Sequence, residues 1–528
     1  MNHQNRYLAI CAIAVIFLFT VASVGPTSYS KAVNIYEKIR VLNQIISIVN
    51  ENYVEPVNWD EALDGAFLGL LDELDPHSSY ISRDKLETVN EQFHGKFEGI
   101  GIEFDLLSGY ITVIAPVVDS PSDRAGLQPG DKIVSIDGED AYEITREDVY
   151  NTLRGPKGTA VLLTIRRPGQ EETFDVEIIR DQIPIYSLIS SFMIDDRTGY
   201  MRLTRFASST SQEVSEAVES LRAEGMTRLI FDLRTNSGGY LEQAVNVADL
   251  FITSPDTLVY TAGRKAEMSE VYVASSERGY GDFAVIVLIN RWSASASEIV
   301  AGAVQDLDRG LVMGETSFGK GLVQRQWPLK DGSALRVTIA RYYTPSGRLI
   351  QRPYDNGTRD YYEDLGKEDR EELLDSLRMD KPKYKTKRGR EVHGGGGISP
   401  DVYVPLSKYT ATITRLVGHP KRPTFNWGTD YAKERKADWK DLVEFNRDFQ
   451  ITAELTENFL TYAKNQNVDF DRKELDKDIS YLRSVLKAEV AGAIWGKSAY
   501  YQMFVSNDPQ VTTALSHFDE AAEFLVHH

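Results

Sequence analysis

Two residues that together could hydrolyse an amide bond lie in the segment from Asn290 to Gln324. Ser295 follows an apolar run and opens the helical pattern SASEIVAGAVQDL, and Lys320 lies between two glycines 25 positions later (320 − 295). A serine hydroxyl needs a base to remove its proton, and a lysine held in its neutral form can be that base. Small and apolar residues flank Lys320, with no carboxylate within two positions, which favours a desolvated, neutral amine.

Other catalytic chemistries find little support in the sequence. The chain has eight histidines, none near this segment, and one cysteine, Cys11, inside an N-terminal apolar run, which excludes a cysteine protease and a disulfide framework. No HExxH or CxxC spacing indicates zinc, so we expect no metal and no organic cofactor. GETSFGKG matches a nucleotide-binding loop only in part, because Gly321 replaces its Ser or Thr and the next residues favour a strand.

Several spaced motifs in this region resemble one known family. SASASEI, then QD, then GETSFGKGLVQ is similar to the carboxy-terminal processing (tail-specific) proteases, which use a serine–lysine dyad. The resemblance implies Ser295 as nucleophile, Lys320 as base and Gln324 as the residue that orients the lysine. The spacing separates the neighbouring serines, because Ser293 and Ser297 lie 27 (320 − 293) and 23 (320 − 297) positions from the lysine.

Backbone donors for an oxyanion are expected at two places. A helix that begins after Ser295 exposes its first N–H groups, so the amide of Ala296 is one candidate. The loop DLRTNSGG resembles the family's oxyanion loop, and the resemblance assigns the second donor to Gly238 or Gly239, with a slight preference for Gly238. The family also places an acid at Asp306, which we interpret as structural support for the site.

The stretch from 94 to 183 has short alternating strands and Gly/Pro turns, which predict a β-domain. Gly99-Ile100-Gly101-Ile102, followed in order by AGL, PGD and LRG, resembles a PDZ domain. Such domains add a peptide strand to a sheet edge and hold its terminal carboxylate on backbone N–H groups. The four residues Gly99, Ile100, Gly101 and Ile102 would be that carboxylate loop, and a small β-domain without a ligand is the alternative.

Strands alternating with helices after Tyr200 predict βαβ units and a buried sheet. We expect a multidomain α/β protein with a crotonase-like protease core, an inserted PDZ β-domain and helical N- and C-terminal regions. The expected segments are a signal peptide or N-terminal membrane anchor (1–28), a helical region (29–93), the PDZ domain (94–183), the α/β core (184–410) with a polar insertion (353–398), and a helical extension (411–528).

The net charge of the chain and its N-terminal residues limit the expected partners and the expected cellular location. A net charge of −19 argues against nucleic acid, so we interpret the basic run KPKYKTKRGR as part of a solvated surface loop in the insertion. Residues 7–24 are mostly apolar after a basic flank, which predicts export to the bacterial periplasm or cell envelope, with anchoring to the inner membrane as an option. For the C-terminal extension we expect a role in packing or oligomerisation, and the oligomeric state stays open.

Taken together, the sequence predicts a serine endopeptidase that recognises free protein C-termini through its PDZ domain and cleaves nearby through an acyl-enzyme. The resemblance also implies that the PDZ domain can gate the active site. One alternative is a catalytically inactive PDZ scaffold in the cell envelope. Another is a crotonase-like enzyme that acts on acyl thioesters, which the PDZ-like segment and the lysine spacing oppose.

Overall fold

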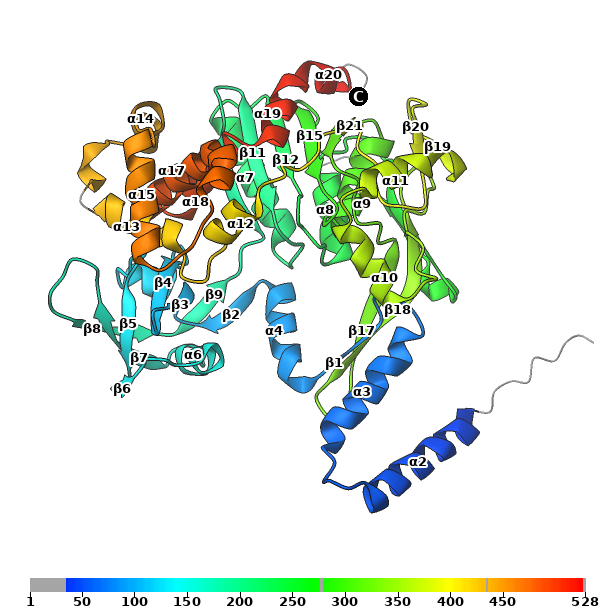
Figure 1. Cartoon of the computed structure of the whole chain (residues 1–528). Coiled ribbons are helices and arrows are strands. Elements are labelled where there is room, and N and C mark those ends of the chain that lie inside the picture. The colour runs from blue at the N-terminus through cyan, green and yellow to red at the C-terminus, as the bar shows by residue number, and fades with distance from the viewer. Residues whose placement is uncertain (1–34, 276–278, 434, 526–528) are drawn as a thin grey trace, which may run out of the picture. The chain divides into compact units, whose positions relative to one another are not determined.

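The computed structural model describes residues 35–275, 279–433 and 435–525 (Figure 1). The predicted export segment at 7–24 lies outside the described residues. The chain divides into two compact units, residues 1–67 and 68–528. None of the described helices is both long and apolar enough to cross a membrane.

The first unit contains helix α2 (Ile35–Asn52) and the start of α3 (Trp59–Asp72). The predicted helical pattern is confirmed here. Its apolar stripe, with Ile35, Ile39, Leu42 and Ile45, is exposed along α2.

A six-stranded sheet is the centre of the second unit. Its strand order is β10-β11-β12-β15-β16-β21, and all neighbours are parallel except β10 and β11. Helices connect the parallel strands, as the alternating pattern predicts. The strands are β10 (Leu188–Met193), β11 (Thr198–Leu203), β12 (Arg228–Asp232), β15 (Ala284–Ile289), β16 (Leu311–Gly314) and β21 (Val402–Tyr403).

Both faces of this sheet are covered, which explains why β15 is apolar at every position. Helices α7 (Thr210–Ala223), α8 (Leu241–Asp249) and α9 (Ala296–Asp306) share one apolar cluster with alternate strand residues such as Phe231 and Val287. The remaining strand residues, such as Ile286, pack with the last helices, α18 (Lys497–Val505), α19 (Pro509–Ser516) and α20 (Phe518–Ala522). The end of the C-terminal extension is therefore part of the core.

A second sheet, antiparallel throughout, carries the segment that follows Lys320. Its path is β1-β18-β13-β14, with β17 paired to β18. A short 3-10 turn, Ala266–Met268, lies between β13 and β14. The strands are β1 (Ser79–Ile81), β13 (Thr257–Gly263), β14 (Val271–Val273), β17 (Leu322–Pro328) and β18 (Ala334–Tyr343).

The predicted β-domain has its own sheet and its own apolar core. Two short helices, α5 (Pro121–Arg124) and α6 (Arg146–Leu153), complete it. Strand β2 (Lys96–Gly99) follows helix α4 (Arg83–His94) and pairs separately with β9 (Asp181–Pro184). The main sheet comprises β3 (Ile102–Leu107), β4 (Tyr110–Pro116), β5 (Lys132–Ile136), β6 (Glu139–Asp140), β7 (Ala160–Arg166) and β8 (Phe174–Ile179).

The insertion is folded. Its basic run, residues 381–390, which we interpret as part of a solvated surface loop, is mostly exposed, but several side chains before it are buried. Tyr361, Leu365 and Arg370 have exposed fractions of only 4%, 1% and 1%. Apolar side chains hidden among many charged ones gave too weak a periodic signal to reveal this. The insertion contains α10 (Thr358–Glu363), α11 (Arg370–Ser376), 3-10 turns at Asp364–Gly366 and Arg378–Asp380, and the hairpin β19 (Lys383–Lys385) with β20 (Glu391–His393).

The extension after residue 410 is helical, as predicted, and most of it packs around one aromatic-rich core that includes Trp427, Phe445 and Phe459. Its helices before α18 are α12 (Ala411–Val417), α13 (Pro423–Lys433), α14 (Leu442–Asp448), α15 (Ala453–Asn465), α16 (Arg472–Leu475) and α17 (Ile479–Trp495). Two 3-10 turns, Lys436–Asp438 and Asp476–Asp478, lie between them.

Candidate active site

Ser295 lies at the N-terminus of α9, just after the buried strand β15. Its backbone has φ 55° and ψ −111°, a conformation that non-glycine residues rarely adopt. Strain of this kind persists where the surrounding structure holds a residue in place, and it is concentrated at functional sites. The turn therefore fixes the half-buried hydroxyl-bearing residue at the positive end of a helix.

Lys320 lies in the loop between β16 and β17 and lines the same cleft as Ser295. The cleft has a volume of about 730 Å³. Burial, and then the charge of Arg336, lower the pKa of Lys320 to about 8, although the charges of Glu298 and Asp75 oppose that shift. The loop leads into a strand and not into a helix, which opposes nucleotide binding at GETSFGKG.

A buried carboxyl that we did not single out from the sequence joins the two candidate residues. Glu298 accepts the backbone N–H of Ser295 (2.7 Å) and that of Lys320 (2.9 Å) on one oxygen. Its other oxygen accepts the Ser317 hydroxyl (2.5 Å) and the Gly319 N–H (2.7 Å). Burial raises the pKa of Glu298 to about 7 despite these four donors. An acid three residues into a helix that begins at a serine is a capping pattern, and that signal could have found it.

Of the two candidates for the second oxyanion donor, Gly239 has the freer N–H group. The Gly238 N–H already donates to Asn236 Oδ1 at 2.9 Å, which argues against the preference drawn from the sequence. Gly238 instead allows close packing, because a Cβ there would lie 2.9 Å from that of Ser295. Among the described residues, the N–H of Gly239 donates to no backbone carbonyl outside the helices and strands. Ala296 is the first residue of α9, where an N–H has no partner within the helix, so both amides are candidate donors.

A buried ion pair, Asp232 and Arg234, lies at the start of the segment that leads to this glycine loop. Arg234 donates three hydrogen bonds to Asp232 at 2.6–3.0 Å and also pairs with Asp508 (2.7 Å) and Gln510 (2.8 Å) at the start of α19. Burial disfavours the charge of Asp232, but the neighbouring arginines outweigh burial and lower its pKa to about 2. The C-terminal helices thus hold the arginine of the DLR motif.

Gln324 lines the cleft, but it does not share a strand with Lys320. Strand β17 begins at Leu322, after the lysine, and its pairing with β18 shifts between Val323 and Gln324. The Gln324 amide donates to Thr338 Oγ1 (3.3 Å). The hydroxyl of Thr338 in turn donates to Asp75 (3.0 Å), which belongs to the LDPHSSY segment. The role of Gln324 in orienting the lysine stays a prediction.

Asp306 lies at the end of α9 and is fully engaged in structural contacts. It pairs with buried Arg348 (2.6 Å) and accepts the Ser346 hydroxyl (2.6 Å) and N–H (3.1 Å). These bonds tie the turn after β18 to the helix that begins at Ser295. They agree with a supporting role and place Asp306 outside the cleft lining.

The predicted carboxylate loop, Gly99 to Ile102, connects β2 to β3. Ser122 donates its N–H to the Ile100 carbonyl (3.0 Å), and Ser120 donates its hydroxyl to the Gly101 carbonyl (2.9 Å). Gly101 has φ 81°, and a Cβ there would come within 2.3 Å of Ser120, so glycine is required. Peptide binding by this loop stays a prediction.

Comparisons with known proteins agree with the two expected modules. A sequence model of peptidase family S41 matches residues 197–360, one of the PDZ domain matches 112–167, and one of a family of unknown function matches 423–496. The carboxy-terminal-processing protease of Bartonella bacilliformis is 37% identical over 322 residues, which cover 60% of this chain and 74% of that protein. Carboxy-terminal processing protease CtpA of Bacillus subtilis is 33% identical over 335 residues, covering 63% and 68%.

Among solved structures, the photosystem II D1 C-terminal processing protease is 27% identical with a TM-score of 0.33, covering 67% of this chain and 84% of that one. The PDZ domain of a carboxy-terminal protease from Vibrio cholerae, solved with a peptide, is 28% identical with a TM-score of 0.16, covering 17% and 97%. The extent and identity of the sequence matches establish that the chain belongs to the carboxy-terminal processing proteases, serine-type peptidases of family S41, and that it carries a PDZ domain.

Proposed function

We propose that the chain is an endopeptidase that binds protein C-termini through its PDZ domain and cleaves nearby with a dyad of Ser295 and Lys320. One observation carries the proposal. A serine in a strained turn at a helix N-terminus shares a cleft with a half-buried lysine whose pKa is lowered to about 8. With that pKa about a tenth of the lysine is neutral at pH 7, against about one in 2,500 for an ordinary lysine.

The neutral Lys320 amine takes the proton of the Ser295 hydroxyl while Oγ attacks the scissile carbonyl carbon. The N–H groups of Ala296 and Gly239 stabilise the negative oxygen that forms, each worth about 3 kcal/mol of barrier. The Lys320 ammonium then protonates the departing amine as the C–N bond breaks, which leaves an acyl-enzyme on Ser295. A water molecule, deprotonated by the same lysine, hydrolyses this ester and restores the dyad.

Recognition of the substrate is assigned to the loop Gly99–Ile102, whose backbone would hold the terminal carboxylate beside strand β3. We place the enzyme in the cell envelope, exported through residues 7–24 and anchored there if that segment is retained. Oligomerisation is left open. A catalytically inactive scaffold would have no need for a desolvated lysine in the same cleft as a strained serine, so we favour the enzyme.

The assignment of the dyad is tested by cleavage of a protein with an apolar C-terminal tag. Ser295→Ala and Lys320→Arg should both abolish turnover, because a guanidinium group stays protonated and cannot act as a base. Ser297→Ala, which removes the hydroxyl bonded to the Asn236 carbonyl, should retain activity. Full turnover by Ser295→Ala would disprove the nucleophile, and near-normal turnover by Lys320→Arg would disprove the base.

The PDZ assignment needs a separate binding measurement on the Ser295→Ala protein. A peptide with a free C-terminus should bind at least tenfold more tightly than the same peptide with an amidated C-terminus, since the amide lacks the negative charge. Equal affinities would remove Gly99–Ile102 from the recognition site while leaving the dyad untouched.

A further inference from the structure

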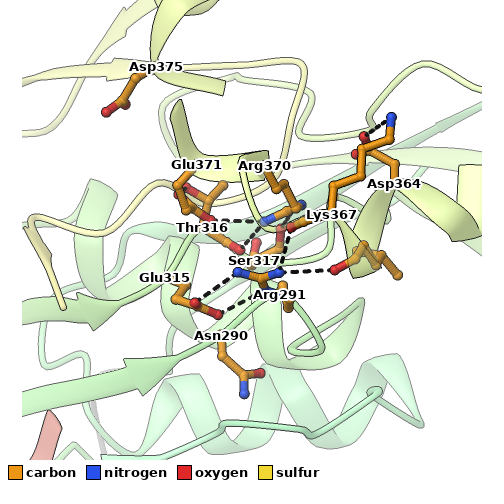
Figure 2. A network of polar contacts seen from close by, with 12 residues as sticks. Asn290, Arg291, Glu315, Thr316, Ser317, Asp364, Lys367, Arg370, Glu371 and Asp375 are labelled. Carbon is orange, nitrogen blue, oxygen red and sulfur yellow. Dashed lines mark hydrogen bonds and ion pairs between the residues drawn. The ribbon is translucent and has the colours of Figure 1, made fainter. Parts of the chain in front are cut away.

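The first half of the insertion makes several contacts with the loop that carries Lys320. Arg370, at the start of α11, is buried and donates to the carbonyls of Thr316 (2.9 Å) and Ser317 (2.7 Å). Its neighbour Glu371 accepts the Thr316 hydroxyl at 2.7 Å, and Figure 2 shows these contacts converging on residues 316–317. Arg291, beside the same loop, donates hydrogen bonds to the carbonyls of Leu365 and Lys367 in the insertion (3.1 Å each).

An aromatic contact holds the next part of the loop. The ring of Tyr361, in α10, packs edge-on against Phe318 with 5.6 Å between centroids. The guanidinium of Arg352 lies over both rings, at 4.4 Å from Phe318 and 3.9 Å from Tyr361, and donates to the Tyr361 carbonyl. The Tyr361 hydroxyl bonds His77 Nε2 at 3.0 Å. Phe318, two residues before the lysine, is thereby fixed by the insertion.

Two side chains of opposite charge anchor the loop, one through its carbonyl groups and the other through its N–H groups. The carbonyls at 316 and 317 face the Arg370 guanidinium, and the N–H groups at 319 and 320 face the Glu298 carboxylate. Hydrogen bonds to ionised groups are about twice as strong as neutral ones. A short loop bound in this way has little freedom to turn, so the direction of the Lys320 side chain depends on both anchors.

We propose that the insertion, through Arg370 and Tyr361, is a positioning element that keeps Lys320 directed into the cleft and away from bulk water. The inference rests on the proposed role of Lys320 as the base. Arg370 does not line the cleft, so it acts through the loop and not on the substrate. The Tyr361 ring, packed against Phe318, also covers the loop from solvent.

The pH dependence of cleavage separates positioning from a merely structural role. The groups that face Lys320 are Asp75, Glu298 and Arg336, together with His77, whose pKa burial lowers to about 3 so that it is neutral at pH 7. Arg370 is not among the charges that shift the pKa of Lys320. A change in the pH profile on replacing Arg370 therefore reports movement or hydration of the lysine, because no facing charge has been removed.

The experiment compares full-length Arg370→Met with Arg378→Met, which removes an exposed arginine of the same insertion that pairs with Asp375. kcat and KM for a tagged peptide are measured from pH 6 to 10.5, with thermal unfolding as a check on folding. Thr316→Val is included as a milder variant that loses only the hydroxyl bonded to Glu371. Lys320→Ala, assayed in parallel, tests the underlying role of the base.

For Arg370→Met we expect kcat at pH 7 to fall at least tenfold with KM within twofold, and the rise in activity to move from near pH 8 toward pH 10. A shift of one pH unit or more corresponds to a tenfold smaller neutral fraction at pH 7. Arg378→Met should match the wild type. An unchanged pH profile in folded Arg370→Met overturns the inference, and Thr316→Val decides in the same way if Arg370→Met does not fold. Activity in Lys320→Ala would instead overturn the dyad itself.

Discussion

Replacement of Glu298 by glutamine is the most informative single change, because the structure shows what each oxygen of the carboxylate does. One oxygen accepts the N–H groups of Ser295 and Lys320, and the other accepts the Ser317 hydroxyl and the Gly319 N–H. A glutamine side chain has only one acceptor oxygen, so its NH₂ group must face one of these pairs of donors.

The less costly orientation turns the new NH₂ toward Ser317 and Gly319, because a hydroxyl can also accept. The Gly319 N–H is then left buried without a partner and close to another donor. An unsatisfied buried N–H costs about 1–3 kcal/mol. If the loop relaxes to escape that cost, the dyad is misplaced, and we expect kcat to fall by about 5- to 150-fold at its plateau.

The same change also moves the pH dependence, in a direction that the structure fixes. The negative charge of Glu298 raises the pKa of Lys320, so its removal should shift the rise in activity to below pH 8. The assay is steady-state cleavage from pH 5 to 10, with the exposed Glu216→Gln on α7 as the matched control. A Glu298→Gln enzyme with the wild-type plateau, or with its rise shifted upward, would refute this account of the carboxylate.

Three further predictions concern stability and packing around the site. Lys320→Met should be inactive, yet it should unfold at a higher temperature than the wild type at pH 7. This difference should shrink between pH 8 and 10.5, because wild-type Lys320 is neutral in the folded state above about pH 8 but stays charged in the unfolded chain. Equal melting temperatures at pH 7 would contradict this expectation. Gly238→Ala should lower kcat at least tenfold because its Cβ would press on Ser295. Gly225→Ala has a similar φ, and its Cβ would make only an ordinary contact with the Asp196 carbonyl oxygen at 3.7 Å, so it should leave kcat unchanged; equal effects of the two would show that strain alone matters. Asp508→Asn should lower the free energy of unfolding, measured in urea, by about 1–3 kcal/mol, because the buried arginine of the DLR motif loses a charged partner. An unaltered free energy of unfolding would make this contact dispensable.

Local patterns were enough to predict the elements that carry the chemistry. The apolar run of β15, the small residues after it and the apolar helical pattern of α9 predicted a serine at a strand-to-helix turn, and the structure has one. The resemblance of the motifs around Ser295 and Lys320 to one family implied a shared site, and both residues line one cleft. Each of the motifs that carried these predictions is a short stretch of consecutive residues.

Features made by distant residues could not be predicted in this way. No carboxylate lies near Lys320 in sequence, yet folding brings Asp75 and Glu298 close enough to oppose the shift of its pKa. The partner of the DLR arginine lies 274 positions away (508 − 234), at a helix for which the sequence offered only a packing role. The buried side chains in the first half of the insertion, such as Tyr361, were not predicted because they are scattered among charged ones. Tertiary contacts of this kind produce no periodic pattern in the sequence.

The rate at which a fluorophosphonate modifies Ser295, followed from pH 6 to 11 with the modified residue identified by mass spectrometry, tests the central claim most directly. It isolates the activation of the hydroxyl from substrate recognition and from release of product. The label should fall on Ser295, the rate should rise with a midpoint near pH 8, and Lys320→Ala should react at least a hundredfold more slowly. A midpoint above pH 10, or a rate that does not depend on Lys320, would contradict a neutral lysine as the base.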